Sequence, residues 1–166
     1  MRKLIVAAGA ALVLALVNFS IWQKENLLAD GRIVLLELAP VDPRSLMQGD
    51  YMALRFKLVN EAFGREDRKN LPDGHVIVAV DEKGVGTFKR LDDGAALAAN
   101  EVRMRYRIRN NQAKFATNAF FFQEGQGSYY ERARYGEFRV SEKGELLLTA
   151  LRGENLQLLG PEKKKL

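Results

Sequence analysis

The chain of 166 residues contains no cysteine, one histidine, one tryptophan and four prolines. Without cysteine it has no disulfide and no thiolate metal site, so a small folded domain has to rely on its apolar core. A zinc site is disfavoured, because His75 has no second histidine or cysteine to join it. A Ser-His-Asp triad would have to use His75, and no pattern places a serine beside it. Because nucleotide-binding glycine motifs are also missing, we expect no metal and no cofactor.

Positive charge is concentrated at the two ends of the chain. The net charge is +5. Arg2 and Lys3 supply two of these charges, and the tail over residues 162–165 supplies another two. The body between them is nearly neutral, so the basic isoelectric point is weak evidence for binding to nucleic acid. We expect no nucleic-acid partner.

A long uncharged run near the N-terminus predicts a membrane anchor. Residues Leu4 to Trp22 contain no charged side chain, and as a helix they would span ~28 Å, close to the thickness of a bilayer's hydrocarbon core. Arg2 and Lys3 precede the run, which predicts a cytoplasmic N-terminus and a C-terminal domain outside the cytoplasm. A cleaved signal peptide is the alternative, but no good small-residue cleavage pair follows the run. We therefore expect residues 4–22 to remain in the lipid bilayer.

After the anchor, the pattern predicts one mainly β domain. We divide the chain into an anchor and short linker (residues 1–30), a β domain (residues 31–160) and a basic tail (residues 161–166). The domain should be an antiparallel sheet, a partly open barrel or a sandwich of about eight strands with one short helix. Expected strands are Arg32–Leu38, Tyr51–Val59, His75–Val80, Val85–Leu91, Glu101–Arg109, Ala113–Phe122, Glu137–Val140, Glu145–Leu151 and an edge strand Asn155–Leu159. The short helix should start at the capping-box sequence Ser128–Glu131 and end near Tyr135.

The most defined local feature is the corner Gly49-Asp50-Tyr51, which leads into a strand. Pro40 and Pro43 stiffen the approach, and Gly49 supplies the freedom that a tight turn needs. Beyond the corner, Met52, Leu54, Phe56 and Leu58 alternate onto one face of the strand.

Gly49, Asp50, Tyr51 and Leu54 match the Gly-Asp-Tyr-x-x-Leu-x-Tyr signature of the bacterial GDYXXLXY family, which this chain resembles. The last signature position departs, because Phe56 replaces the tyrosine. The resemblance extends over Asp42-Pro43-Arg44, the segment from Phe120 to Glu131 and the overall length. It implies a membrane-tethered domain, often encoded beside multi-pass membrane proteins, and it implies no particular activity. On this basis we expect a single-pass protein of the bacterial inner membrane.

Two sets of carboxylates are candidates for a site. Asp50 at the corner could place its carboxylate in a pocket, or it could only satisfy its own backbone in a turn. The hydroxyl of Tyr51 could reach a ligand, or its ring could lie in the interior with a hydrogen-bonded tip. Glu124 and Glu131 flank a glycine-containing joint and could form an acid/base pair or bind a cation. Alternatively, Glu131 caps the short helix and Glu124 lies in solvent.

A row of arginines is the remaining candidate for a binding site. Arg103, Arg105, Arg107 and Arg109 occupy alternate positions of one predicted strand, so they should share a face at a spacing of ~6.6 Å. Such a row could hold anionic lipid headgroups, a phosphorylated ligand or an acidic partner. The alternative is a solvated face whose charges meet acidic residues on neighbouring strands, such as Glu137 or Glu145.

A weaker similarity links the layout to type I signal peptidases, which are also membrane-anchored, mainly β and use a Ser/Lys dyad. In that family the nucleophilic serine lies eight residues before the Gly of the Gly-Asp pair, and here that position is Val41. Lys89 stands where the general base would be, and Ser45 corresponds to a different, non-nucleophilic position. The comparison therefore argues against peptidase activity.

These observations support three hypotheses of function. The favoured one is a non-catalytic extracytoplasmic module that docks on a multi-pass membrane protein or assists envelope assembly. The second is a hydrolase or peptidase-like enzyme that uses Ser45 and Lys89, or the carboxylates of Asp50, Glu124 and Glu131. The third is a binder of small anionic ligands or lipid headgroups that uses the arginine row.

Overall fold

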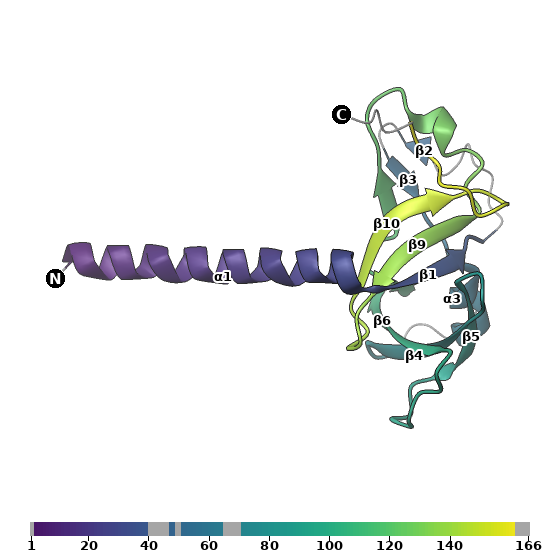
Figure 1. The fold of residues 1–166 in the computed structure, drawn as a ribbon, viewed down its shortest axis with the longest axis horizontal. Helices are drawn as coiled ribbons and strands as arrows, with labels where there is room; N and C mark the ends of the chain where they lie inside the picture. Colours follow the sequence, from purple (N-terminus) through teal and green to yellow (C-terminus); the bar gives the residue numbers. More distant parts are fainter. Residues whose placement is uncertain (1, 40–46, 49–50, 65–70, 162–166) are drawn as a thin grey trace.

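The N-terminal helix extends as a single rod from a β body in the computed structural model (Figure 1). The structure describes residues 2–39, 47–48, 51–64 and 71–161. Helix α1 (Arg2–Asp30) has 29 residues, and at ~1.5 Å per residue it is ~44 Å long. It is long and apolar enough to cross a membrane, a test that an N-terminal signal sequence also passes. The expected apolar N-terminal helix is confirmed, and its last turns extend beyond the predicted span.

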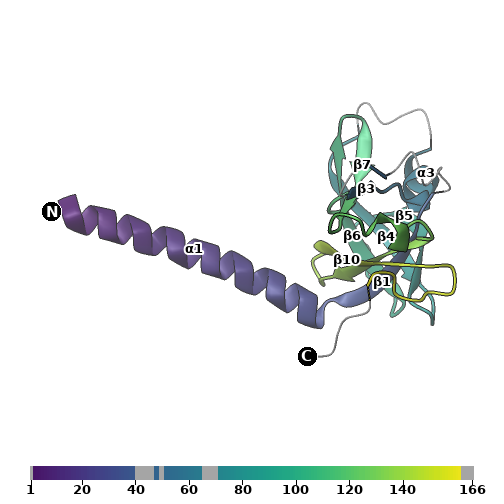
Figure 2. The same ribbon diagram turned by 90° about the horizontal axis from the view of Figure 1, so that it is seen from above.

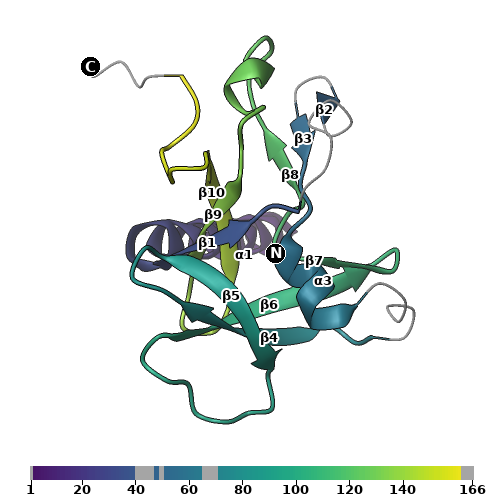
Figure 3. The ribbon, with the colours of Figure 1, turned by 90° about the vertical axis from the view of Figure 1, so that its right-hand side faces the viewer.

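The body is built around a curled sheet of seven strands, which forms half of a barrel (Figure 3). The strand order is β10-β9-β1-β5-β4-β6-β7. These strands are β1 (Arg32–Glu37), β4 (Gly74–Val80), β5 (Val85–Leu91), β6 (Glu101–Arg109), β7 (Gln112–Lys114), β9 (Tyr135–Val140) and β10 (Leu146–Arg152). The mainly β fold with a partly open barrel is therefore confirmed.

A smaller sheet stands beside one end of the large one (Figure 3). It has the order β2-β3-β8, from β2 (Met47–Gln48), β3 (Tyr51–Ala53) and β8 (Ala119–Phe121). Helix α3 (Lys57–Phe63) follows β3 and buries Leu58, Val59 and Phe63. One turn of 3-10 helix covers Gly127–Tyr129.

One strand pair departs from the expected antiparallel sheet, because β1 and β5 run parallel. Gly86 lies at this pairing, opposite Leu36. A Cβ atom at Gly86 would lie 2.6 Å from a methyl group of Val78 and 2.8 Å from one of Val34. Glycine therefore allows the flanking strands β4 and β1 to bring their branched side chains together over β5.

The core lies inside the curl of the large sheet and is centred on three fully buried rings. The ring of Phe56 packs edge-on against Phe138 at 5.3 Å and against Phe115 at 6.4 Å. The predicted apolar face after the corner is correct, because Met52, Leu54, Phe56 and Leu58 are all buried. The predicted strand Tyr51–Val59 is wrong, since β3 ends at Ala53 and α3 starts at Lys57. An extended stretch and a following helix direct their apolar side chains into the same core.

Three other predicted elements differ from the structure. Ala113–Phe122 is two strands, because Ala116 between them has a φ of 54° that interrupts regular pairing. The predicted helix from Ser128 to Tyr135 is wrong, since only the single turn Gly127–Tyr129 forms and no side chain caps it. The predicted edge strand Asn155–Leu159 is reduced to one bridge between Leu158 and Arg152.

The connection between α1 and the sheet is a single residue, Gly31. Helix α1 ends at Asp30, and β1 begins at Arg32 near the middle of the sheet. A Cβ atom at Gly31 would collide with the carbonyl oxygen of Leu27, so the sharp turn requires glycine. Leu27 is buried against the body, and Arg139 on β9 donates a hydrogen bond to the Gly31 carbonyl at 3.0 Å. The base of the helix is therefore fixed to the sheet by packing and by a hydrogen bond.

Candidate functional site

The signature segment forms part of the small sheet. Gly49 and Asp50 lie outside the described residues, so the predicted role of Asp50 is not addressed. Tyr51 pairs with Phe121 across β3 and β8, and the two ring centroids are 5.7 Å apart. The next residue, Met52, is buried in the core. Because successive side chains of a strand point to opposite faces, Tyr51 and Phe121 lie on the outer face of the small sheet.

A cluster of aromatic rings fills the other face of this sheet. Tyr130 is buried, and its ring packs against Phe120 at 5.1 Å and Phe122 at 5.3 Å. Burial raises the pKa of the Tyr130 hydroxyl. Phe121 lies between these two phenylalanines in the chain, yet it exposes 71% of its surface, and Tyr129 exposes 50%. The cluster therefore supports an aromatic surface that faces outward.

The arginine row lies on the outer face of β6, as predicted, and three of its four members are ion-paired. Arg103 Nε is 2.6 Å from an Asp92 carboxylate oxygen, and Arg105 Nη1 is 2.7 Å from one of Glu145. Glu145 is thus confirmed as a partner, whereas Glu137 binds Arg152 on β10.

The third pair joins Arg109 to Asp73 at 3.1 Å. A hydrogen bond from the Ile108 backbone amide, reinforced by Arg109, lowers the pKa of the Asp73 carboxyl. The Arg107 side chain makes no ion pair or hydrogen bond with any residue that the structure describes, although its charge also acts on Asp73. The face is therefore largely neutralised from within, except at Arg107.

A cleft separates the base of α1 from this face of the sheet. Its lining includes Trp22, Gln23 and Lys24 from α1, and Arg103, Lys143 and Glu145 from the body. The outer face of β6 therefore faces the last turns of the helix, beside the end of the predicted span.

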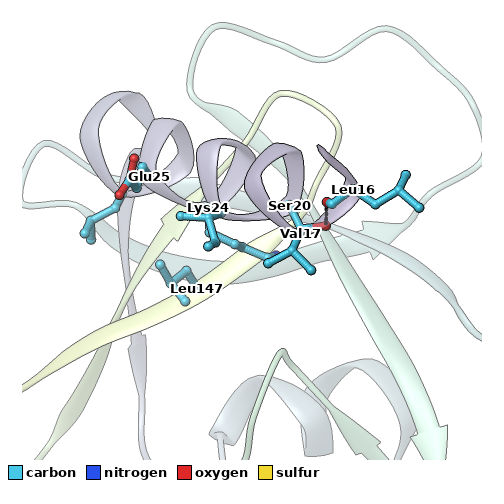
Figure 4. Close-up of a pocket in the computed structure, with 8 residues that line it drawn as sticks. Leu16, Val17, Ser20, Lys24, Glu25 and Leu147 are labelled. Atoms are coloured by element: carbon cyan, nitrogen blue, oxygen red, sulfur yellow. Dashed lines mark hydrogen bonds between the residues drawn. The ribbon is translucent and has the colours of Figure 1, made fainter. Parts of the chain in front are cut away.

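On another side of α1, a shallow apolar groove meets Leu147 of β10 (Figure 4). This groove is formed mostly by the helix itself, including Leu16, Val17 and Ser20. The Ser20 hydroxyl donates to the Leu16 carbonyl at 3.0 Å, so it is satisfied within the helix.

The candidate catalytic groups are not brought together in the described part of the chain. Glu124 and Glu131 are exposed, and neither makes an ion pair or hydrogen bond with a described residue. Lys89 Nζ lies 2.6 Å from a Glu101 carboxylate oxygen, while Ser45 lies outside the described residues. Over residues 2–39, 47–48, 51–64 and 71–161, no three carboxylate or histidine side chains are grouped as metal ligands would be.

Two features were missed by the sequence reasoning. The first is Phe121, which is exposed because it is the central residue of the run Phe120-Phe121-Phe122 and points away from the face that its two neighbours occupy. The second is Glu101, a buried carboxylate that forms ion pairs with Lys89 and with Arg90 at 3.5 Å. It also accepts a hydrogen bond from the backbone amide of Ala98 at 3.1 Å. The hydrogen bonds from Lys89 and Ala98 lower the pKa of Glu101. Its place at the head of β6 gave no signal in the sequence, because its partners lie on another strand and in a loop.

Comparison with known proteins identifies a family for this chain. The sequence model of a family described as "GDYXXLXY protein" matches residues 13–151, which include α1 from Val13 onward and nearly the whole β body. No curated protein and no solved structure gives a significant match. The match covers most of the chain and agrees with the signature residues in and before β3, so the chain belongs to the GDYXXLXY family.

Proposed function

We propose that this chain is a membrane-anchored module that docks on a multi-pass membrane protein through the outer face of its small sheet. In this proposal α1 stays in the inner membrane of a bacterium, and the β body lies outside the cytoplasm. Arg2 and Lys3 support that orientation, because positive residues flanking a span favour the cytoplasmic side. The module acts by contact and carries out no reaction of its own.

The observation that carries the proposal is the exposure of Phe121 beside Tyr51. A phenylalanine that exposes 71% of its surface on an edge strand contributes little to the core. Aromatic residues are enriched at protein interfaces, where a few of them supply most of the binding energy. Phe120, Phe122 and Tyr130 support the surface from behind, so its geometry is set before a partner arrives.

The apolar N-terminal helix supports a membrane protein as the partner in this proposal. A body joined to its anchor through one residue stays close to the bilayer, so proteins within the same membrane are its nearest neighbours. Confinement to one membrane also raises the effective concentration of such a partner.

The test is affinity purification from membranes with the full chain, with and without crosslinking. We expect it to recover a multi-pass membrane protein, and we expect Phe121→Ala to weaken that recovery by about thirty-fold, as for an interface residue worth ~2 kcal/mol. The variant should fold normally, because Phe121 is largely exposed. Leu158→Ala is the matched control, since Leu158 exposes 58% of its surface outside the small sheet. Recovery of no multi-pass protein, or equal recovery by Phe121→Ala, would contradict the proposal.

A further inference from the structure

The outer face of β6 is directed toward the bilayer that α1 would enter. Arg103 and Glu145 line the same cleft as Trp22 and Gln23, which end the apolar run of the helix. Figure 2 shows β6 and β7 on the side of the body toward which α1 extends. The inference shares the membrane anchor with the proposed function, but it is independent of any protein partner.

Two cations on this face lie opposite each other, and neither forms an ion pair with a residue that the structure describes. Arg107 on β6 is the direct cross-strand neighbour of Lys114 on β7, so both side chains are on one face. Like charges at such positions are destabilising unless an anion lies between them. Asp73 is a described carboxylate that the charge of Arg107 reaches, but it already accepts hydrogen bonds from Arg109 and the Ile108 amide.

The hairpin of β6 and β7 therefore carries an excess of positive charge. Among the described residues, Asp73 is the only carboxylate that forms an ion pair with Arg107, Arg109 or Lys114. The excess contrasts with the paired arginines nearer to the cleft, Arg103 and Arg105. These side chains are on an open face and Arg107 is exposed. A flat surface that carries many anions fits this position better than a single buried anionic ligand.

We propose that Arg107 and Lys114 bind the anionic phospholipid headgroups of the bilayer that α1 enters. Headgroup phosphates are strong acceptors for arginine and lysine. Each basic side chain near an anionic surface contributes ~1 kcal/mol, so the pair should favour an anionic lipid over a zwitterionic one by about thirty-fold.

The absence of cysteine allows a direct test on the full chain. Gln112→Cys places a single cysteine at an exposed position of β7, next to the cation pair, for labelling with a fluorescent donor. The labelled protein is inserted in phosphatidylcholine nanodiscs that contain a trace of phosphatidylglycerol or phosphatidylcholine with an identical acceptor on an acyl chain. Energy transfer then reports which lipid gathers beside the hairpin.

We expect stronger transfer to phosphatidylglycerol, a preference that salt weakens and that Arg107→Gln with Lys114→Gln reduces by up to about thirty-fold. Lys83→Gln with Arg132→Gln is the matched control, because it removes two exposed positive charges that lie outside the hairpin of β6 and β7. Circular dichroism verifies folding, and co-elution with the nanodisc verifies the anchor separately. Equal transfer to both lipids in the parent protein, or equal losses in both double variants, would overturn the proposal.

Discussion

Replacing Gly86 by alanine should destabilise the body by overpacking the only parallel strand pair in its described sheets. The added methyl group would meet Val78 at 2.6 Å and Val34 at 2.8 Å, on strands to either side of β5. Both neighbours are β-branched, so their χ1 rotamers leave little room to adjust. Overpacking of this kind costs ~1–3 kcal/mol, and the two-sided contact indicates a value near ~3 kcal/mol. For a chain of this size that corresponds to a fall in melting temperature of about 6–12 °C.

The measurement is thermal unfolding of the full chain in detergent, followed by far-ultraviolet circular dichroism. Tryptophan fluorescence is unsuitable, because Trp22 is exposed on α1 and lies outside the core of the β body. Gly153→Ala is the control: its methyl group would meet the end of the exposed Gln157 side chain, which can rotate away. We expect this control to cost less than ~1 kcal/mol. If Gly86→Ala and Gly153→Ala had the same melting temperature, the packing of β1 and β4 across β5 would not be as described.

Two further predictions concern carboxylates. The pKa of Glu101 is lowered in the folded chain, so its ionised form stabilises the fold above its unfolded pKa of ~4.3, and this contribution is lost as the pH falls through the folded value. Glu101→Gln should therefore flatten the decline of melting temperature below about pH 5, and an unchanged decline would contradict this. Asp81 accepts hydrogen bonds from the amides of Lys83 and Val85 at 2.9 and 2.8 Å, so Asp81→Ala should cost ~1 kcal/mol in a urea titration while Asp81→Asn keeps most of the stability. Equal losses in both Asp81 variants would show that the turn does not depend on this oxygen.

Strands with a clear local pattern were predictable, and elements decided by distant contacts were not. The alternation of Glu101–Arg109 predicted β6 with the correct bounds, because one face is buried and the other is charged. The alternation after Tyr51 gave the correct buried face but the wrong element, because α3 and β3 deliver their side chains to one core. The parallel pairing of β1 with β5 could not be predicted, since no local pattern records which strands become neighbours.

The candidate site was predictable to a similar degree. The shared face of the arginine row follows from a period of two, and the Glu145 partner of Arg105 was anticipated. The partners of Arg103 and Arg109 were not anticipated, because Asp92 and Asp73 lie in the segments that flank strands β4 and β5. The exposure of Phe121 could not be predicted, because three identical residues in a row do not show which side chains point into the core and which point outward.

The one-residue join between α1 and β1 gives the protein the form of a lever. Because β1 lies near the middle of the seven-stranded sheet, a tilt or rotation of the helix is transmitted to the centre of the body rather than absorbed by a slack tether. Gly31 is the whole linker, so the join has little slack. The packing of Leu27 and the hydrogen bond from Arg139 fix the angle at which the helix and the body meet. If α1 lies in a bilayer, as we propose, a neighbouring helix that leans on it would thus swing the small sheet beside one end of the large one, turning a motion inside the membrane into one outside it.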